Sequence, residues 1–151
     1  MINVEDIPRA GMEALLRRMS FCHLGCVDGR GRPYVVPMNF AYDGEAVYFF
    51  TTEGMKTENM EQHPEVCLQV EEIEDAAHWQ SVMVFGPAER LARADDVEHA
   101  MQQITRSNPT LTPAINHTQI DSSGRANKIA VYRVRPTAMD GRRAVAAPGA
   151  S

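Results

Sequence analysis

One segment of the sequence combines residue types that together could hold a phosphate group. An apolar run over residues 46–51 ends at Thr51 and Thr52, turns through Gly54 and continues into a stretch that carries Lys56. The N-terminus of a helix presents unpaired N–H groups and a partial positive charge, so it attracts anions. The hydroxyls would add donors and the lysine a full charge. Because threonine is common in strands, these residue types alone leave an ordinary surface open as the alternative.

Other residues that could act in catalysis or bind a metal have simpler explanations. Cys22 and Cys26 lack the C-x-x-C spacing, and on a strand they share one face, where cysteine packs as a small hydrophobic residue. The five histidines form no local cluster, so we predict no metal site; His78 and His117 are interpreted as surface residues. The serines lack the G-x-S-x-G context of an activated nucleophile. The sequence therefore assigns no catalytic residue.

Composition and charge narrow the class of protein. The 151 residues are 44% apolar and 23% charged, which is typical of a single globular domain. A net charge of -5 argues against a nucleic-acid partner. No apolar run approaches the roughly 18 residues of a membrane span, and the acidic N-terminal residues do not resemble a signal peptide. Three cysteines without a disulfide spacing fit a reducing compartment. We therefore expect a cytoplasmic protein with no membrane partner.

The elements that must position the phosphate-binding segment are mostly strands. Alternating or β-branched apolar runs predict six of them, at residues 21–27, 33–42, 46–51, 66–70, 81–91 and 128–134. Turn residues at 28–32 and at 43–44 predict hairpins between the first three. Pro37 lies inside the second strand, which a sheet tolerates at an edge or a bulge. The Gly-Pro pair at 86–87 predicts a bend in the fifth strand.

Helices and loops complete the predicted order. An apolar stripe over residues 12–19 and a short stretch at 55–63 predict two helices, and a third begins near Asp95, which could cap it. The acidic run 71–75 and the polar segment 108–126 are predicted as loops. Because hairpins dominate, we predict a mainly β (α+β) fold with an antiparallel sheet closed into a small barrel. Residues 1–135 form one domain, and residues 136–151 are predicted to be a flexible tail.

Several segments, taken in order, resemble a known family. The similarity runs from about residue 15 to residue 91, with a weaker match at 132–134, and is carried by segments 32–40, 47–59, 64–67 and 79–88. Together they resemble the pyridoxamine-5'-phosphate oxidase-like, FMN-binding split-barrel proteins, and in particular the short branch that includes the nitroimidazole-resistance proteins. The resemblance implies a homodimer of six-stranded antiparallel split β-barrels with short flanking helices. FMN would bind at the subunit interface, with a small-molecule substrate.

The resemblance also implies a role for particular residues. Those that would hold the phosphate are Thr51, Thr52, Lys56 and Arg32. Those that would lie along the isoalloxazine ring are Val36, Pro37, Met38 and Asn39. Those that would reach the flavin from the second subunit are Trp79, Gln80 and Ser81. The apolar strand residues Tyr34, Val82 and Val84 also predict a dimer, because three short helices would not cover them.

Two departures from the family guide the expected activity. Pro37 stands where true pyridoxamine-phosphate oxidases carry a substrate-binding lysine, and Phe50 stands where nitroimidazole-resistance relatives often carry histidine. We therefore expect a flavin-dependent oxidoreductase that passes electrons to a small acceptor other than the vitamin. The alternatives are a module that binds flavin, haem or a deazaflavin without turnover, and a dimeric scaffold without a cofactor.

Overall fold

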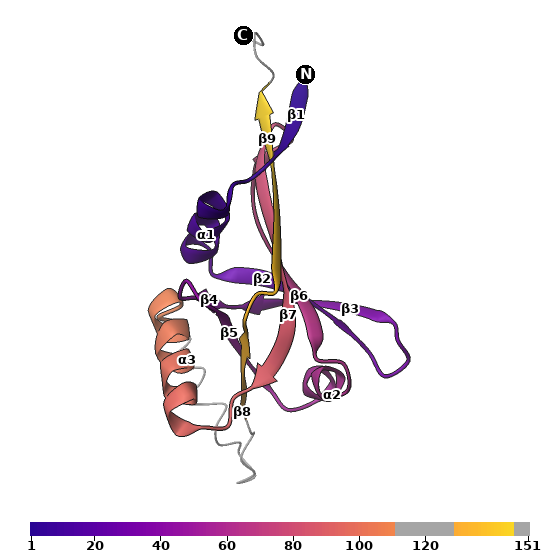
Figure 1. Cartoon of the computed structure of the whole chain (residues 1–151), viewed down its shortest axis with the longest axis vertical. Coiled ribbons are helices and arrows are strands. Elements are labelled where there is room, and N and C mark those ends of the chain that lie inside the picture. Colours follow the sequence, from indigo (N-terminus) through magenta and orange to yellow (C-terminus); the bar gives the residue numbers. More distant parts are fainter. Residues whose placement is uncertain (111–128, 147–151) are drawn as a thin grey trace.

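A computed structural model describes residues 1–110 and 129–146 of the chain. Its strands are β1 (Ile2–Asp6), β2 (Phe21–Val27), β3 (Pro33–Asn39), β4 (Ala41–Tyr42), β5 (Val47–Thr52), β6 (Glu65–Asp75), β7 (His78–Arg90), β8 (Ile129–Val134) and β9 (Ala138–Ala146). Its helices are α1 (Arg9–Arg18), α2 (Met55–Gln62) and α3 (Ala94–Ser107). In Figure 1, strands β1 and β9 and the paired ends of β6 and β7 form a narrow arm that extends away from the barrel.

The strands form one antiparallel sheet that curls into an open barrel. The order is β3-β2-β6-β7-β8-β5-β4, so β3 and β4 lie at the two ends and leave the barrel split. β7 pairs with β6 along one edge and shares its other edge between β9 and β8. The change of partner falls at Gly86, where a Cβ atom would lie 2.5 Å from the carbonyl oxygen of Arg135. A residue without a side chain is therefore required at the predicted bend.

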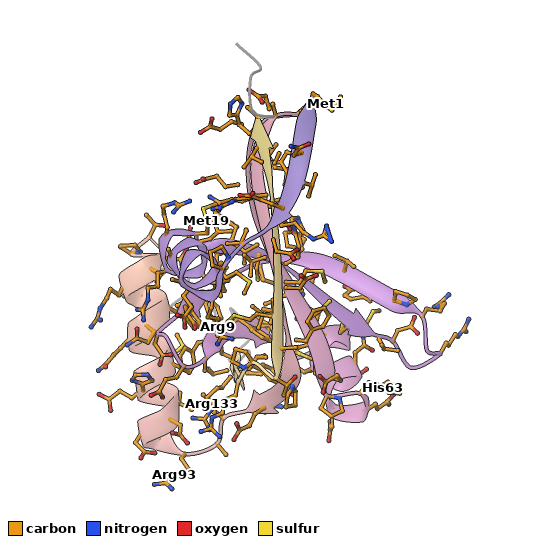
Figure 2. All side chains as sticks on the ribbon, turned by 45° about the horizontal axis from the view of Figure 1, so that its top comes forward. Met1, Arg9, Met19, His63, Arg93 and Arg133 are labelled. Atoms are coloured by element: carbon orange, nitrogen blue, oxygen red, sulfur yellow. The ribbon has the colours of Figure 1, made fainter. Side chains whose placement is uncertain are left out.

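The core lies on both sides of the sheet half that contains β5 and β8. Inside the barrel, Phe49 is fully buried and stacks on Tyr132 with ring centroids 5.3 Å apart. On the opposite face of β5, Tyr48 lies beneath α3, whose buried residues are Ala100 and Ile104. Burying one large side chain contributes roughly 1.5–3 kcal/mol, so these two layers fix the position of β5. Figure 2 shows side chains filling the space between helices and sheet.

The structure confirms the mainly β, split-barrel fold, but the sheet is not closed, because β3 and β4 do not pair, and several elements also differ from the sequence prediction. The predicted tail contains β9, which pairs with β7 and β1, and the predicted acidic loop 71–75 is the outer part of β6. Both were missed because their Ala, Gly, Asp and Glu residues are poor strand formers, and pairing with the long β7 provides the hydrogen bonds instead. Asp95 lies in the first turn of α3, and Arg93 is the N-cap. Residues 111–128, with His117 and most of the predicted 108–126 loop, and residues 147–151 lie outside the described residues.

Candidate functional site

The predicted phosphate-binding segment forms the junction of β5 and α2. Thr51 is buried on the inner side of the barrel, and Thr52 is exposed at the end of the strand. The Gly54 N–H donates to Thr57 Oγ1 at 3.0 Å, and this hydroxyl donates back to the Gly54 carbonyl at 2.9 Å. Since a glycine has no side chain to cap the helix, Thr57 orients the turn that starts α2. The junction therefore presents a helix N-terminus beside an exposed hydroxyl.

Lys56 lies in the first turn of α2, on the side that faces β2. Burial raises the pKa of the Cys26 thiol, and the nearby positive charge of Lys56 opposes this effect by lowering it. Asn59 Nδ2 approaches Cys26 Sγ at 4.0 Å, which places α2 against β2. None of the ion pairs within residues 1–110 and 129–146 involves Lys56. The charge of Lys56 is thus available to an anion.

No hydrogen bond within the described residues joins Arg32 to either threonine. It lies at the end of the β2–β3 hairpin, where its Nε donates to Asp28 Oδ2 at 2.9 Å. Backbone N–H groups of Arg32 and Arg30 also donate to Asp28, and these bonds hold the pKa of its carboxyl below the usual range. The hairpin approaches the C-terminal end of α2, because a Cβ on Gly29 would lie 3.4 Å from Gln62 Oε1. The role of Arg32 in phosphate binding stays a prediction.

The predicted ring-binding residues lie on β3, which is an edge of the sheet. Val36 and Met38 point toward the barrel core, whereas Pro37 is exposed on the opposite side. β3 stays paired with β2 over its whole length, so the nitrogen atoms of Pro33 and Pro37 must face the free edge. This agrees with the edge position predicted from Pro37. Asn39 Nδ2 donates to Asn108 Oδ1 at 3.3 Å and is held by the end of α3.

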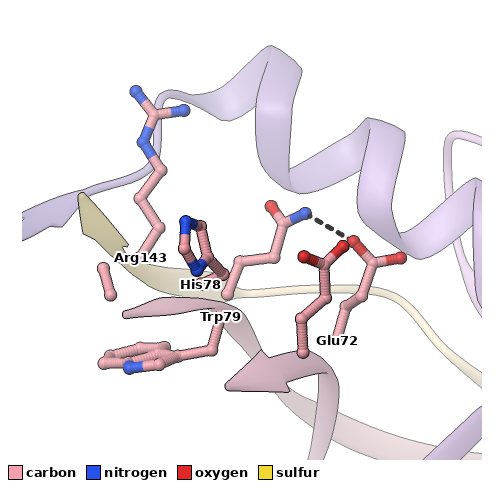
Figure 3. A pocket seen from close by; sticks show the side chains of 7 residues that line it. Glu72, His78, Trp79 and Arg143 are labelled. Carbon is pink, nitrogen blue, oxygen red and sulfur yellow. Dashed lines mark hydrogen bonds between the residues drawn. The ribbon is translucent and has the colours of Figure 1, made fainter. Parts of the chain in front are cut away.

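Trp79, Gln80 and Ser81 lie on the arm, at the other end of β7 from its pairing with β8. Gln80 Nε2 donates to Glu72 Oε1 at 3.2 Å, and Ser81 Oγ accepts from Gln69 Nε2 at 2.9 Å. Figure 3 shows Trp79 extending away from Glu72, beside a shallow hollow of about 300 Å³. Within one chain these three residues are therefore separated from the β5–α2 junction by most of the length of β7.

The outer side of β3, β2, β6 and β7, which we call the outer face, combines apolar side chains with polar ones such as Gln69, Glu71 and Ser81. Strand register places its apolar members on one side of the sheet: Phe21, Val35, Cys67, Ile73, Trp79, Met83 and Phe85. Phe21, Val35 and Ile73 are 64%, 64% and 63% exposed. The sequence prediction chose the wrong face of β7, because Val82 and Val84 are fully buried inside the barrel.

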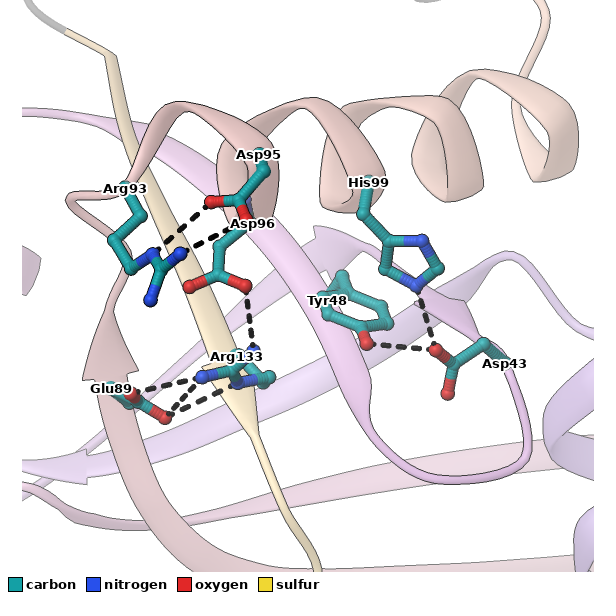
Figure 4. Close-up of polar contacts among 8 residues, drawn as sticks. All are labelled: Asp43, Tyr48, Glu89, Arg93, Asp95, Asp96, His99 and Arg133. Atoms are coloured by element: carbon teal, nitrogen blue, oxygen red, sulfur yellow. Dashed lines mark hydrogen bonds and ion pairs between the residues drawn. The ribbon is translucent and has the colours of Figure 1, made fainter.

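The structure also contains a polar cluster that sequence reasoning missed (Figure 4). The Tyr48 hydroxyl donates to Asp43 Oδ2 at 2.7 Å, and His99 Nε2 lies 3.0 Å from the same oxygen. Burial raises the pKa of Asp43, but hydrogen bonds from His99, two backbone N–H groups and Tyr48 outweigh it and lower the pKa to about 2. The Asp-Gly pair at 43–44 predicts a turn, but no local pattern in the sequence connects Asp43 with His99, which lies 56 positions later.

The lowered pKa of Asp43 predicts a pH-dependent stability. The pKa of this carboxyl falls from an ordinary value of 3.8 to about 2 in the folded protein, so its contribution to stability is present above about pH 4 and is lost as the pH falls toward 2. Because the Asp43 side chain is 14% exposed, we expect Asp43→Asn to lower the free energy of unfolding at pH 7 by about 1–2 kcal/mol. Urea unfolding at pH 7 and pH 3 measures this, and an equal loss on acidification in both proteins would contradict it.

No group of three His, Cys, Asp or Glu side chains within the described part of the chain is arranged to hold a metal ion. Among the same residues, no helix has the length and apolar character needed to cross a membrane.

The open antiparallel barrel, with its strand-to-helix junction at one end and an arm at the other, defines a split-barrel protein. A family model described as pyridoxamine 5'-phosphate oxidase matches residues 8–143. The chain belongs to this family, as the sequence resemblance predicted. An uncharacterized protein of Rhizobium meliloti, RA0666, is 34% identical over 68 residues, which is 45% of each chain. The chain thus spans under half the length of this relative.

Solved structures share the fold. An FAD-binding protein from Mesorhizobium loti has a TM-score of 0.76 and 24% identity over 97% of this chain and 100% of its own. A protein named for 5-nitroimidazole antibiotic resistance, from Bacteroides thetaiotaomicron, has a TM-score of 0.75 and 23% identity over 95% of this chain and 89% of its own. At these identities the similarity establishes the split-barrel fold.

Proposed function

We propose that the protein binds FMN between two copies of the chain and acts as a flavin-dependent oxidoreductase. The observation that carries the proposal is the β5–α2 junction. There Lys56 lies beside an exposed helix N-terminus and has no carboxylate partner among the described residues. Family membership and a similar structure named for binding FAD support a flavin as the ligand.

The junction fits a phosphate group. A Cβ on Gly54 would meet no atom within 4 Å, so the space in front of the helix N-terminus is open. Thr52 and Lys56 supply a hydroxyl and a charge there, and the first N–H groups of α2 point the same way. Arg32 would join them by leaving Asp28, to which it is bound at an exposed hairpin. Thr51 is buried, and its hydroxyl makes one long hydrogen bond, 3.3 Å to the Thr52 carbonyl.

A second copy of the chain would complete the site. Trp79, Gln80 and Ser81 are too far along β7 to reach the junction of their own chain, so their predicted role requires a partner. Two copies would associate through the outer face, because it exposes large apolar side chains on a continuous sheet and ends at Trp79 on the arm. Such faces on soluble proteins mark association sites. The free edge of β3, which offers carbonyl and N–H groups, borders this face.

A bound flavin supplies hydride and electron transfer, and the chain supplies its binding and environment. Lys56 and the N-terminus of α2 would hold the phosphate, and β3 would orient the ring along its free edge. The outer faces of two copies would exclude water from the ring. Pro37 offers no charge at the position where vitamin-oxidising relatives bind substrate. We therefore propose electron transfer to a small acceptor other than pyridoxamine 5'-phosphate.

An absorption spectrum of the purified protein tests the cofactor. We expect a flavin band, with FMN released on denaturation, because one helix N-terminus and one lysine would suit a single phosphate group. A Soret band would indicate haem and contradict the proposal, and so would failure to bind added FMN. Oxidation of NAD(P)H with added acceptors then tests turnover. A flavin band without any oxidation of NAD(P)H would indicate a flavin-binding module and would refute the proposed oxidoreductase activity.

A further inference from the structure

A second pocket lies apart from the proposed flavin site, between the C-terminal end of α1, the β4–β5 turn and α3. Its volume is about 760 Å³, which falls in the range of small-molecule sites. Such sites are usually lined by apolar side chains. Here polar and charged side chains dominate, including Arg17, Gln103 and Arg106. A polar and charged ligand is therefore expected.

One face of α3 supplies one wall of this pocket. His99, Gln103 and Arg106 follow each other at intervals of four and three residues, which places them on the same side of a helix. All three line the pocket. The apolar stripe of α3, with Ala100 and Ile104, is turned toward the sheet instead. The polar stripe thus faces α1 across an open space.

On the opposite wall, the exposed side chain of Arg17 packs against Tyr42. Its guanidinium lies over the ring of Tyr42, 5.7 Å from the centroid. Nη2 of Arg17 also lies against Gly44 in the β4–β5 turn, where the positive φ of 99° favours a glycine. Cation–π packing of this kind orients a guanidinium without neutralising its charge.

Among the described residues, the charges around the pocket leave two arginines without an ion-pair partner. Asp43 accepts hydrogen bonds from Tyr48, His99 and two backbone N–H groups, so its charge is already satisfied. Arg133 is paired with Glu89 at 3.0 Å and with Asp96 at 3.5 Å (Figure 4).

Within the described ranges, Arg17 and Arg106 take part in none of the ion pairs. The acidic side chain that remains is Glu45, which is exposed at the rim.

We propose that this pocket binds a small organic anion whose carboxylate or phosphate oxygens are held by Arg17 and Arg106. Guanidinium groups match both kinds of oxyanion through paired N–H donors. Gln103 and Ser107 lie beside Arg106 and supply further polar contacts for the body of the ligand. The pocket is built from residues of α1, β4–β5 and α3, so it is separate from Lys56 and the β5–α2 junction.

An NMR titration of the full-length, ¹⁵N-labelled protein with citrate and, separately, with pyrophosphate tests the proposal. We expect saturable shifts at Gln103, Arg106 and Arg17. Arg17→Gln and Arg106→Gln should each weaken binding about tenfold, the lower end expected for a charge-assisted hydrogen bond at an accessible site. Arg93→Gln is the matched control, because it removes an exposed arginine at the start of the same helix and should leave the affinity unchanged. The spectra also report whether each variant is folded.

The two probes and a second variant separate the alternatives. Saturation by citrate alone assigns a carboxylate, and saturation by pyrophosphate alone assigns a phosphate. If Lys56→Ala abolishes binding, the anions sit in the proposed flavin site and the inference is wrong. It is also wrong if neither probe gives saturable shifts, or if Arg93→Gln weakens binding as much as the pocket variants do. FMN affinity should be unchanged in Arg17→Gln, so failure of this proposal leaves the proposed function untouched.

Discussion

The Lys56→Ala variant is expected to bind FMN roughly ten- to a hundredfold more weakly than the wild-type protein. The substitution removes a charge-assisted hydrogen bond to the phosphate, and such a bond contributes about 1.5–3 kcal/mol. About 1.4 kcal/mol corresponds to one decade of affinity. Lys56 has no ion-pair partner in the described part of the chain, so its loss leaves no carboxylate unpaired. A flavin-fluorescence titration measures both dissociation constants.

Riboflavin and two further variants serve as controls for this result. Riboflavin lacks the phosphate, so it should bind the wild type weakly and be little affected by Lys56→Ala. Lys56→Arg should recover part of the FMN affinity, and Arg93→Ala should leave it unchanged. The cofactor-free protein should lose less than about 1 kcal/mol of stability, because a partly exposed lysine contributes little to folding. Equal losses for FMN and riboflavin would show that Lys56 acts on the fold or the ring.

Placing an acid on the outer face is expected to dissociate the proposed dimer and to release the flavin with it. Val35 is 64% exposed on β3, beside the free edge, so Val35→Asp should not disturb the core of one chain. In a dimer the new carboxylate would be buried without a partner, which costs several kcal/mol. We therefore expect at least a hundredfold weaker dimer, roughly 2.7 kcal/mol or more. Light scattering and the flavin absorption band measure the two effects.

A matched control separates an interface effect from the added charge. Gln102→Asp places the same acid on an exposed position of α3, which packs on β5 and β8 and away from the outer face. This variant should stay dimeric and retain its flavin. If the wild-type protein is a monomer at micromolar concentration, Trp79, Gln80 and Ser81 have no partner and the interface model is refuted. If Val35→Asp is monomeric but still binds FMN normally, one chain is sufficient for the site.

The local pattern of the sequence was enough to predict the strands that carry the proposed site. Residues 46–51 alternate between two buried layers, and the turn and helix that follow them appear where Gly54 and Lys56 predicted them. β9 could not be predicted from its own residues, because its pairing with β7 and β1 depends on strands far away in the sequence. The same is true of the Asp43–His99 contact, which joins a turn to a helix. Long-range pairing, and not residue type, decides such elements.

The face of β7 also could not be deduced from its composition. Val82 and Val84 alternate with Met83 and Phe85, so both sides of the strand are apolar in the sequence. Val82 and Val84 are buried because they lie on the inner side of the barrel, beside their pairing partners Val70 and Leu68 on β6. Apolar residues on both sides of a strand are typical when one side meets the core and the other an additional partner. The fold of a single chain fully buries only the side that carries Val82 and Val84.

Strand β9 has a consequence for the order in which the molecule can fold. Ile2 pairs with Ala146 and Phe85 pairs with Ala138, so β9 joins β1, at the start of the chain, to β7. During synthesis the free edge of β7 stays unpaired until residues 129–146 leave the ribosome, and β1 waits for the same strand. Folds dominated by such distant contacts form slowly, in milliseconds to seconds, and an unpaired edge invites pairing with other chains. Refolding yield should therefore fall with rising protein concentration.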